Sequence, residues 1–321
     1  MASGYQPVPV AEAEAAARRI RGSVLRTPLV RLPVDDAPGE LLLKLENLQP
    51  IGSFKLRGAG NALELVGADA LAAGIWTASA GNMAQAVAWH ARLHSLSCTV
   101  VVPETAPKTK LDAVARLGAE IVKVPVPVWL EVFRTRTYPG MEGFFVHPFS
   151  DPNVIAGNAT IGLEIAEDAP DVEAVVVPYG GGGLCCGIAS ALRELAPRCR
   201  IYACEVETAA PLTASLAAGE PVGVEHTASF VDGIGAPTVF PEMFALARQL
   251  VDGAIDVSLV EIADAIRLLV ERVRIVAEGA GAASVAAALS GRAGTGKIVC
   301  VVSGGNIDTP VLRTILDGNT P

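Results

Sequence analysis

The sequence predicts an α/β fold built on parallel β-sheets, and three observations lead to this class. Short apolar runs of strand length, at residues 75–78 and 98–102, are each followed by a longer helical pattern, at 82–94 and 108–117. The same alternation returns after residue 150. A run of glycines at 180–183 separates one such strand from the next helix. Alternation at this spacing indicates βαβ units, whose strands lie parallel.

The elements follow one another without repeats or low-complexity linkers. In the first half we expect strands at 41–45, 75–78, 98–102, 120–124 and 144–147, and helices at 11–20, 54–66, 82–94, 108–117 and 128–136. In the second half we expect strands at 174–177, 200–204 and 298–302, and helices at 153–166, 184–195, 209–217, 242–250, 259–274 and 280–289. The boundaries follow from the apolar period and from Pro and Gly punctuation.

Composition limits the classes of function. Of the 321 residues 51% are hydrophobic, enough for a sizeable core, and the net charge is −9. The acidic balance and the lack of a Lys/Arg block argue against nucleic acid as a partner. No apolar run reaches transmembrane length, and residues 1–21 lack the pattern of a signal peptide, so we expect a cytoplasmic protein that does not bind a membrane. The six cysteines contain no C-x-x-C pair, which predicts free thiols and no structural zinc.

Lys55 lies where a helix should begin. The segment Q-P-I-G at 49–52 breaks the preceding strand, and Ser53 stands at the expected N-cap. Lys55 then falls in the first helical turn, where the positive end of the helix dipole lowers the affinity of an amine for a proton. A lysine that attacks an aldehyde needs a neutral amine. Position alone nevertheless favours a solvated surface lysine, the commoner fate of this residue.

Three further segments follow strands and carry glycine. The glycines at 180–183 let backbone N–H groups approach an anion at the start of the next helix, and phosphate fits this context better than a plain flexible turn does. The S-A-G-N segment at 79–82 also opens a helix, although on local grounds Ser79 and Asn82 could equally be helix caps. The S-G-G-N segment at 303–306 is by itself a polar turn.

Together these motifs resemble a known family. The sequence S-F-K-L-R-G-A at 53–59 is similar to the Schiff-base lysine motif of the serine/threonine dehydratases, fold-type-II pyridoxal-phosphate (PLP) enzymes that include serine racemase. The segments at 79–82, 180–184 and 303–306 match further family motifs in the right order. The resemblance extends from about residue 27 to residue 308. Four motifs in order are specific, whereas any one alone is weak.

The resemblance implies a PLP cofactor, a site and a domain division. Lys55 would be the catalytic residue, and the cofactor would be bound by Lys55, Phe54, Asn82, Gly180, Gly181, Gly182, Gly183, Leu184, Gly233, Glu278 and Ser303. The substrate would be bound by Ser79, Ala80, Gly81, Asn82 and Asn158. We expect a large PLP-binding domain formed by residues 1–73 and 150–321 and a small domain at 74–149, each with a mainly parallel twisted sheet flanked by helices. The family also suggests a homodimer.

The implied reaction is α,β-elimination from an L-β-hydroxy amino acid of the threonine or serine type, which yields a 2-oxo acid and ammonia. An amino-acid racemase and a catalytically silent protein that binds PLP or an amino acid are the alternatives. Serine racemases have a second serine where this chain has Ala80, whose methyl group cannot donate a proton. Asn158 replaces a glutamine usual in the family, so the preferred substrate stays open. Pro211 stands where metal-dependent members have an aspartate, so we expect no metal site.

Overall fold

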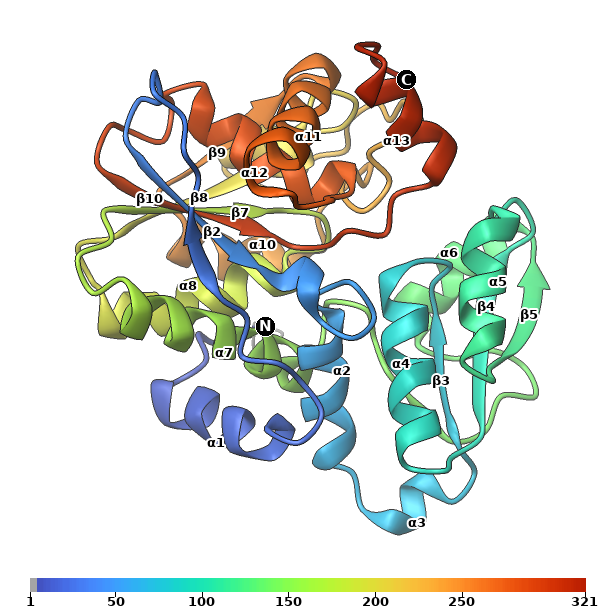
Figure 1. Ribbon diagram of the computed structural model, residues 1–321. Coiled ribbons are helices and arrows are strands. Elements are labelled where there is room, and N and C mark those ends of the chain that lie inside the picture. The colour runs from blue at the N-terminus through green and yellow to red at the C-terminus, as the bar shows by residue number, and fades with distance from the viewer. Residues whose placement is uncertain (1–4) are drawn as a thin grey trace.

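The computed structural model describes residues 5–321 and contains two β-sheets (Figure 1). The larger sheet has six strands in the order β1-β2-β10-β7-β8-β9. Only the β1–β2 pair is antiparallel, and the other neighbours are parallel. In sheet order the strands are β1 (Leu29–Arg31), β2 (Glu40–Leu45), β10 (Lys297–Val302), β7 (Ala174–Pro178), β8 (Arg200–Val206) and β9 (Gly253–Val257).

Helices cover both faces of this sheet (Figure 1). The central strands are Val- and Ile-rich and buried on both sides, as parallel strands between two helical layers require. One face packs on α1 (Val10–Ile20), α7 (Pro152–Asp168), α8 (Gly183–Leu195), α9 (Pro211–Ala218) and α10 (Pro241–Leu250). The other packs on α11 (Leu259–Val273), α12 (Gly279–Leu289) and α13 (Thr309–Leu316).

The smaller sheet is entirely parallel, with strand order β5-β4-β3-β6. Its strands are β3 (Ile75–Ala78), β4 (Cys98–Pro103), β5 (Glu120–Val124) and β6 (Phe144–Phe145). Helices α4 (Asn82–Leu93) and α5 (Lys108–Arg116) cover one face, and α6 (Val126–Thr135) covers the other. The short helix α3 (Ala68–Leu71) leads into β3. All four strands fall inside the predicted small domain at 74–149, whose exact limits stay a prediction.

Helix α2 (Lys55–Glu64) lies between the two sheets and packs on both parts of the molecule (Figure 1). Leu56, Ala59 and Leu63 belong to the same apolar cluster as α4. On another side α2 lies against α7. Because both neighbours hold it, the first residue of α2 is presented between the two sheets.

The structure differs from the sequence prediction at a few elements. Strands β1 and β9 and helices α3 and α13 were not predicted, and β6 contains two residues where four were expected. Strand β9 lies at the edge of the sheet and includes Gly253 and the exposed Asp256, so its apolar pattern is short. The alternation of strands and helices from residue 75 onward is present as predicted.

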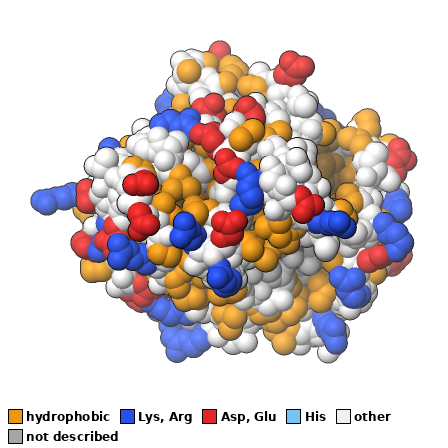
Figure 2. All heavy atoms as spheres, turned by 45° about the horizontal axis from the view of Figure 1, so that its top comes forward, with side chains coloured by type: hydrophobic (Ala, Val, Ile, Leu, Met, Phe, Trp, Pro, Cys, Tyr) orange, Lys and Arg blue, Asp and Glu red, His pale blue; other side chains and the backbone are white. Residues whose placement is uncertain are grey.

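The surface carries charges of both signs. On the face shown in Figure 2, Lys and Arg alternate with Asp and Glu among apolar side chains. No helix within residues 5–321 is long and apolar enough to cross a membrane. The six cysteines are buried free thiols.

Candidate active site

The first turn of α2 is held against the segment that follows β10. Ser53 forms an isolated antiparallel bridge with Gly304. The N–H of Phe54 donates to the carbonyl oxygen of Ser303 at 3.0 Å. These contacts place Lys55, the first residue of α2, beside the carboxyl end of the large sheet.

The predicted capping role of Ser53 is wrong. Phe54 occupies the N-cap position of α2, and no side chain caps this helix. The hydroxyl of Ser53 is buried and has no hydrogen-bond partner among residues 5–321. Ser53 pairs with Gly304 instead, one residue before the position from which a side chain reaches the first N–H groups of a helix.

The amine of Lys55 forms its hydrogen bond with an uncharged group rather than with a carboxylate. Its Nζ donates to the carbonyl oxygen of Pro148 at 2.6 Å and lies 5.1 Å from the ring centroid of Phe54. Burial lowers the pKa of Lys55 to about 8, because water stabilises the ammonium form better than this environment does, while the charge of Glu278 acts in the opposite direction. The pKa of Lys55 is therefore lowered in the predicted direction, and burial is the cause.

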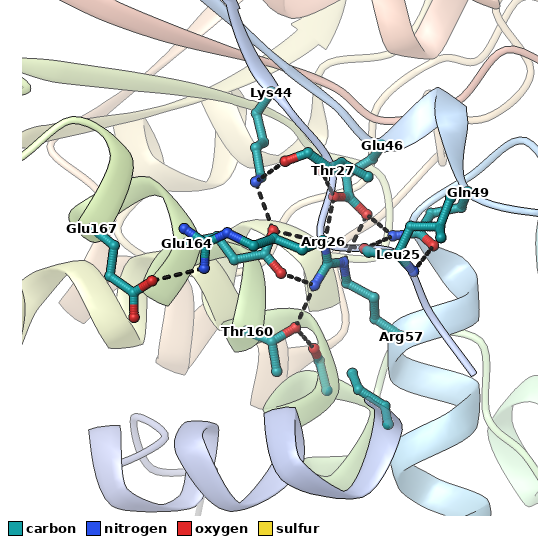
Figure 3. A network of polar contacts seen from close by, with 12 residues as sticks. Leu25, Arg26, Thr27, Lys44, Glu46, Gln49, Arg57, Thr160, Glu164 and Glu167 are labelled. Carbon is teal, nitrogen blue, oxygen red and sulfur yellow. Dashed lines mark hydrogen bonds and ion pairs between the residues drawn. The ribbon is translucent and has the colours of Figure 1, made fainter. Parts of the chain in front are cut away.

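A buried ionic network lies along the next residues of α2 (Figure 3). The guanidinium of Arg57 donates to both oxygens of Glu46, each at 2.8 Å, and to the two oxygens of Glu164 at 2.7 and 2.9 Å. Lys44 lies 2.6 Å from Glu164 and donates to the carbonyl oxygen of Thr27 at 2.7 Å. Two cations thus face two carboxylates, and the network ties α2 to β2 and α7.

A chain of polar contacts connects the small sheet to the start of α12. The side chain of Asn82, at the start of α4, donates to Glu278 at 2.7 Å and accepts from Asn306, also at 2.7 Å. Burial raises the pKa of Glu278 to about 7, although the hydrogen bond from Asn82 acts to lower it. Glu278 can therefore gain or lose a proton near neutral pH.

The loop at 79–82 follows β3 and is partly exposed. The N–H of Gly81 donates to the hydroxyl of Ser79 at 3.2 Å. Nearby, Lys110 of α5 forms an ion pair with Asp232, which links the small-sheet helices to the segment that contains Gly233. Loop and ion pair border the same space, since both Lys110 and Asp232 act on the pKa of Glu278.

The glycine loop joins β7 to α8. Gly182 has φ +88°, a conformation that favours glycine. A Cβ on Gly181 would overlap the ring of Phe149, and one on Gly183 would lie 2.7 Å from the Phe149 carbonyl oxygen. The first N–H groups of α8 have no acceptor within the helix, so the loop forms a cradle that suits an anion such as phosphate.

The structure brings most of the predicted site residues together. Gly180 lies against Gly233, since a Cβ on Gly180 would be 3.2 Å from the Gly233 carbonyl oxygen. Gly233 in turn lies near Glu278, and Gly304, next to Ser303, leaves no room for a Cβ beside Glu278. Phe54 and Lys55 join this group through the contact with Ser303, and Asn82 joins it through Glu278. Gly181, Gly182, Gly183 and Leu184 follow Gly180 in the chain, and Ser79, Ala80 and Gly81 precede Asn82.

Asn158 is placed differently. It is 1% exposed in the middle of α7 and packs between α2 and α8, where a Cβ on Gly58 would lie 3.0 Å from its Oδ1. That oxygen has no hydrogen-bond partner in the described part of the chain. The structure therefore does not bring Asn158 to the loop at 79–82, and its predicted contact with substrate stays a prediction.

Sequence reasoning missed several residues of the site. Phe149 and the carbonyl of Pro148 contact the glycine loop and Lys55, and Asn306 holds Asn82. The only local signal for Phe149 was its place two residues after the predicted strand at 144–147. The partners of Arg57 had no local signal, because Glu164 is 107 residues away in the chain.

Glu205 caps a helix. Its Oε1 accepts from the N–H of Leu212 at 2.9 Å, and its Oε2 accepts from the N–H and hydroxyl of Thr213 at 2.7 and 2.8 Å. Both carboxylate oxygens are thus occupied by the first turn of α9. Residues 5–321 contain no group of three or more His, Cys, Asp or Glu side chains that could hold a metal ion.

The described residues fit a small molecule with an aldehyde and a phosphate. The Lys55 amine, with its lowered pKa, suits covalent attachment to an aldehyde. The glycine cradle suits the phosphate, because the first N–H groups of α8 have no acceptor within the helix. The Asn82–Glu278 pair offers polar groups between these two points.

Comparisons with known proteins agree with this chemistry. An L-threonine ammonia-lyase of Thermotoga maritima is 40% identical over 307 residues, which are 94% of this chain and 76% of that protein. A solved threonine deaminase from T.th. is 35% identical with TM-score 0.87, and the match covers 94% of this chain and 99% of that one. A solved maize serine racemase is 30% identical with TM-score 0.87, and the match covers 98% of both chains.

A family model settles the wider class. The model described as "Pyridoxal-phosphate dependent enzyme" matches residues 20–304. The predicted fold class and the predicted PLP cofactor are confirmed by this match and by the solved structures above. The chain belongs to the family of pyridoxal-phosphate dependent enzymes.

Proposed function

We propose that this enzyme is a PLP-dependent dehydratase, a lyase that converts an L-β-hydroxy amino acid of the threonine or serine type to a 2-oxo acid and ammonia. The names of the similar ammonia-lyase and deaminase support this reaction. The observation that carries it is the amine of Lys55, whose pKa is lowered to about 8 beside a glycine cradle.

The residues of the site would hold the cofactor at separate points. Lys55 would bind its aldehyde carbon, and Gly180 to Gly183 together with Leu184 would bind its phosphate. Asn82 and Ser303 would face its polar ring atoms, with Phe54, Gly233 and Glu278 around them. Bound PLP supplies an electron sink that stabilises negative charge at the substrate α-carbon.

Lys55 would also move the proton. Its Nζ would stay within reach of the α-carbon of a substrate held at the same site. An amine with a pKa of about 8 is neutral in a much larger fraction near pH 7 than an ordinary lysine, so Lys55 can take the α-proton. The carbonyl of Pro148, 2.6 Å from Nζ, accepts a hydrogen bond from the amine and orients it.

Substrate and ring nitrogen would be held by uncharged groups. The N–H groups of the loop at 79–82 open α4 and can bind the substrate carboxylate. The hydroxyl of Ser303 is neutral, so it does not enforce protonation of the ring nitrogen as a carboxylate would. A weaker electron sink favours prompt loss of the β-hydroxyl over a long-lived carbanion.

A racemase is the second candidate, because the maize serine racemase has the same fold. Racemisation requires a proton donor on the face opposite Lys55. Ala80 lies in the loop at 79–82 and offers only a methyl group there. Elimination needs no such donor, so Ala80 favours the dehydratase.

The finer assignments extend this proposal. It includes substrate contact by Asn158. It also includes the domain limits at 1–73, 74–149 and 150–321, which the two separate sheets support. We also propose a homodimer in the cytoplasm; its buried free thiols suit a reducing compartment. Release of ammonia from an amino acid suits a role in amino-acid catabolism.

The proposed function is tested by incubating the PLP-loaded enzyme with L-threonine and L-serine. We expect a 2-oxo acid and ammonia in equal amounts, with little or no D-serine or α-epimer of threonine on chiral chromatography. Epimer formed as fast as 2-oxo acid would identify a racemase. PLP-loaded protein that converts neither amino acid would indicate a catalytically silent binding protein.

A further inference from the structure

The ring of Phe149 lies between the two reactive ends of the site. The carbonyl oxygen of its neighbour Pro148 accepts a hydrogen bond from the Lys55 amine at 2.6 Å. On the other side, the ring occupies the place of a side chain on Gly181, and the Phe149 carbonyl oxygen would be 2.7 Å from a Cβ on Gly183. Phe149 therefore fills the wall between the lysine amine and the glycine loop.

This wall is apolar. The ring centroid of Phe149 lies 4.6 Å from that of His147, 5.1 Å from Phe240 and 6.3 Å from Phe133. Burial lowers the pKa of His147 to about 3, which keeps the imidazole neutral. Its Nδ1 accepts from the N–H groups of Phe149 and Ser150, and its Nε2 donates to the Phe133 carbonyl.

The ring also remains accessible. Phe149 is partly exposed, whereas Val146, His147 and Pro148 before it are buried. Both nitrogens of His147 are used inside the cluster, so this buried histidine offers no free polar group beside Phe149. A small apolar group can be buried there without displacing a hydrogen bond.

The proposed reaction leaves one direction for the substrate side chain. In the proposed reaction the α-proton would face Lys55, the amino group would face the cofactor, and the carboxylate would face the loop at 79–82. The fourth substituent of the α-carbon, which carries the β-carbon, must then point toward the remaining wall. Of the side chains described above, Phe149 lies on that side, because it follows the residue that contacts Lys55 and its ring packs on the glycine loop.

We propose that Phe149 determines substrate specificity by contacting the β-methyl group, so that the enzyme prefers threonine-type substrates to serine. This inference rests on the proposed dehydratase activity. One methylene-sized group in a hydrophobic pocket changes kcat/KM by roughly 10- to 200-fold. Because Phe149 is partly exposed, we expect a preference near the lower end, about 10-fold.

The first test compares kcat/KM for L-threonine and L-serine in the wild type, Phe149→Leu and Phe149→Ala. We expect the threonine preference of about 10-fold to shrink in Phe149→Leu and to vanish in Phe149→Ala, mainly through loss of activity on threonine. Phe240→Leu is the matched control, because it alters the same cluster behind the ring and should preserve the ratio. A ratio unchanged in both Phe149 variants overturns the inference.

A second readout measures binding without turnover. L-2-aminobutyrate and L-alanine lack the hydroxyl leaving group and differ by one CH₂, so their Kd values follow from the change in cofactor absorbance. We expect 2-aminobutyrate to bind about 4-fold more tightly in the wild type, the value of one buried CH₂, and equally with alanine in Phe149→Ala. If Phe149→Ala does not load PLP, Phe149→Leu gives the same comparison.

The two proposals fail in different ways. Wild-type enzyme that favours 2-aminobutyrate but releases no 2-oxo acid would contradict the dehydratase and leave the Phe149 contact standing. Wild-type enzyme that releases 2-oxo acid equally well from threonine and serine would support the dehydratase and contradict the role of Phe149.

Discussion

Lys55 and Arg57 are two residues apart on α2, Arg57 is buried and Lys55 is partly buried, and their environments act on them in opposite ways. Burial lowers the pKa of Lys55 to about 8, because its closest partner is the neutral carbonyl of Pro148. Burial also acts to lower the pKa of Arg57, but Glu46 and Glu164 outweigh it and raise that pKa. The same helix turn thus holds one permanent cation and one amine that can be neutral.

The carboxylates show the same contrast. Burial acts to raise the pKa of Glu46, but Arg57 outweighs burial and the pKa is lowered, so Glu46 stays ionised. Burial also raises the pKa of Glu278, here to about 7, because the hydrogen bond from Asn82 that acts to lower it does not outweigh burial. Full pairing fixes charge and holds α2 in place, whereas partial pairing leaves groups that can exchange protons.

The largest expected effect comes from removing the Lys55 amine, whose hydrogen-bond partner is uncharged. We expect Lys55→Ala to lower 2-oxo acid release by at least about 10³-fold, because both cofactor attachment and proton transfer are lost. The fold should persist, since the Arg57 network is intact, and far-UV circular dichroism checks this. Near wild-type turnover in this variant would show that the contrast between Lys55 and Arg57 has no role in catalysis.

Removing the paired cation should instead affect stability. Arg57→Met leaves Glu46 and Glu164 buried with less compensation, which typically costs about 3–5 kcal/mol in the free energy of unfolding. The double variant Arg57→Met/Glu46→Gln should recover part of this loss, because it also removes a buried charge. Denaturant unfolding measures both, and Arg134→Ala, in an exposed ion pair on α6, is the control.

An Arg57→Met protein as stable as the wild type would mean that the network does not hold α2. A double variant less stable than Arg57→Met would mean that Glu46 stabilises the fold independently of Arg57.

Glu278→Gln tests the contrast between Glu46 and Glu278 through the pH dependence of the free energy of unfolding. A carboxyl whose pKa is raised from 4.5 to about 7 on folding destabilises the fold as pH rises through this window, by up to about 3 kcal/mol in the cofactor-free protein. Glu278→Gln should remove this loss between pH 4.5 and 7. For Lys55, whose pKa is lowered, the stability of the wild type should rise with pH between about pH 8 and 10.5.

Unfolding measured across pH 4 to 11 separates these two windows. Identical profiles for wild type and Glu278→Gln below pH 7 would mean that Glu278 is not held in a raised-pKa environment.

The parts of the site that follow local patterns could be predicted from the sequence. Lys55 at a helix start, Asn82 after a strand and the glycines at 180–183 each carry a signal within a few residues, and the structure places them as expected. Ser53 was misassigned because its pairing with Gly304 crosses about 250 residues. Phe149 and the partners of Arg57 depend on contacts that no local window contains.

The most direct test of the contrast between the two cations is to locate the lysine that holds the cofactor. The PLP-loaded enzyme is reduced with borohydride, digested and analysed by peptide mass spectrometry. We expect the phosphopyridoxyl group on Lys55 alone, with the buried and paired Lys44 unmodified. A label on another lysine, or no label on a protein that binds PLP, would contradict the assignment of Lys55 as the reactive amine.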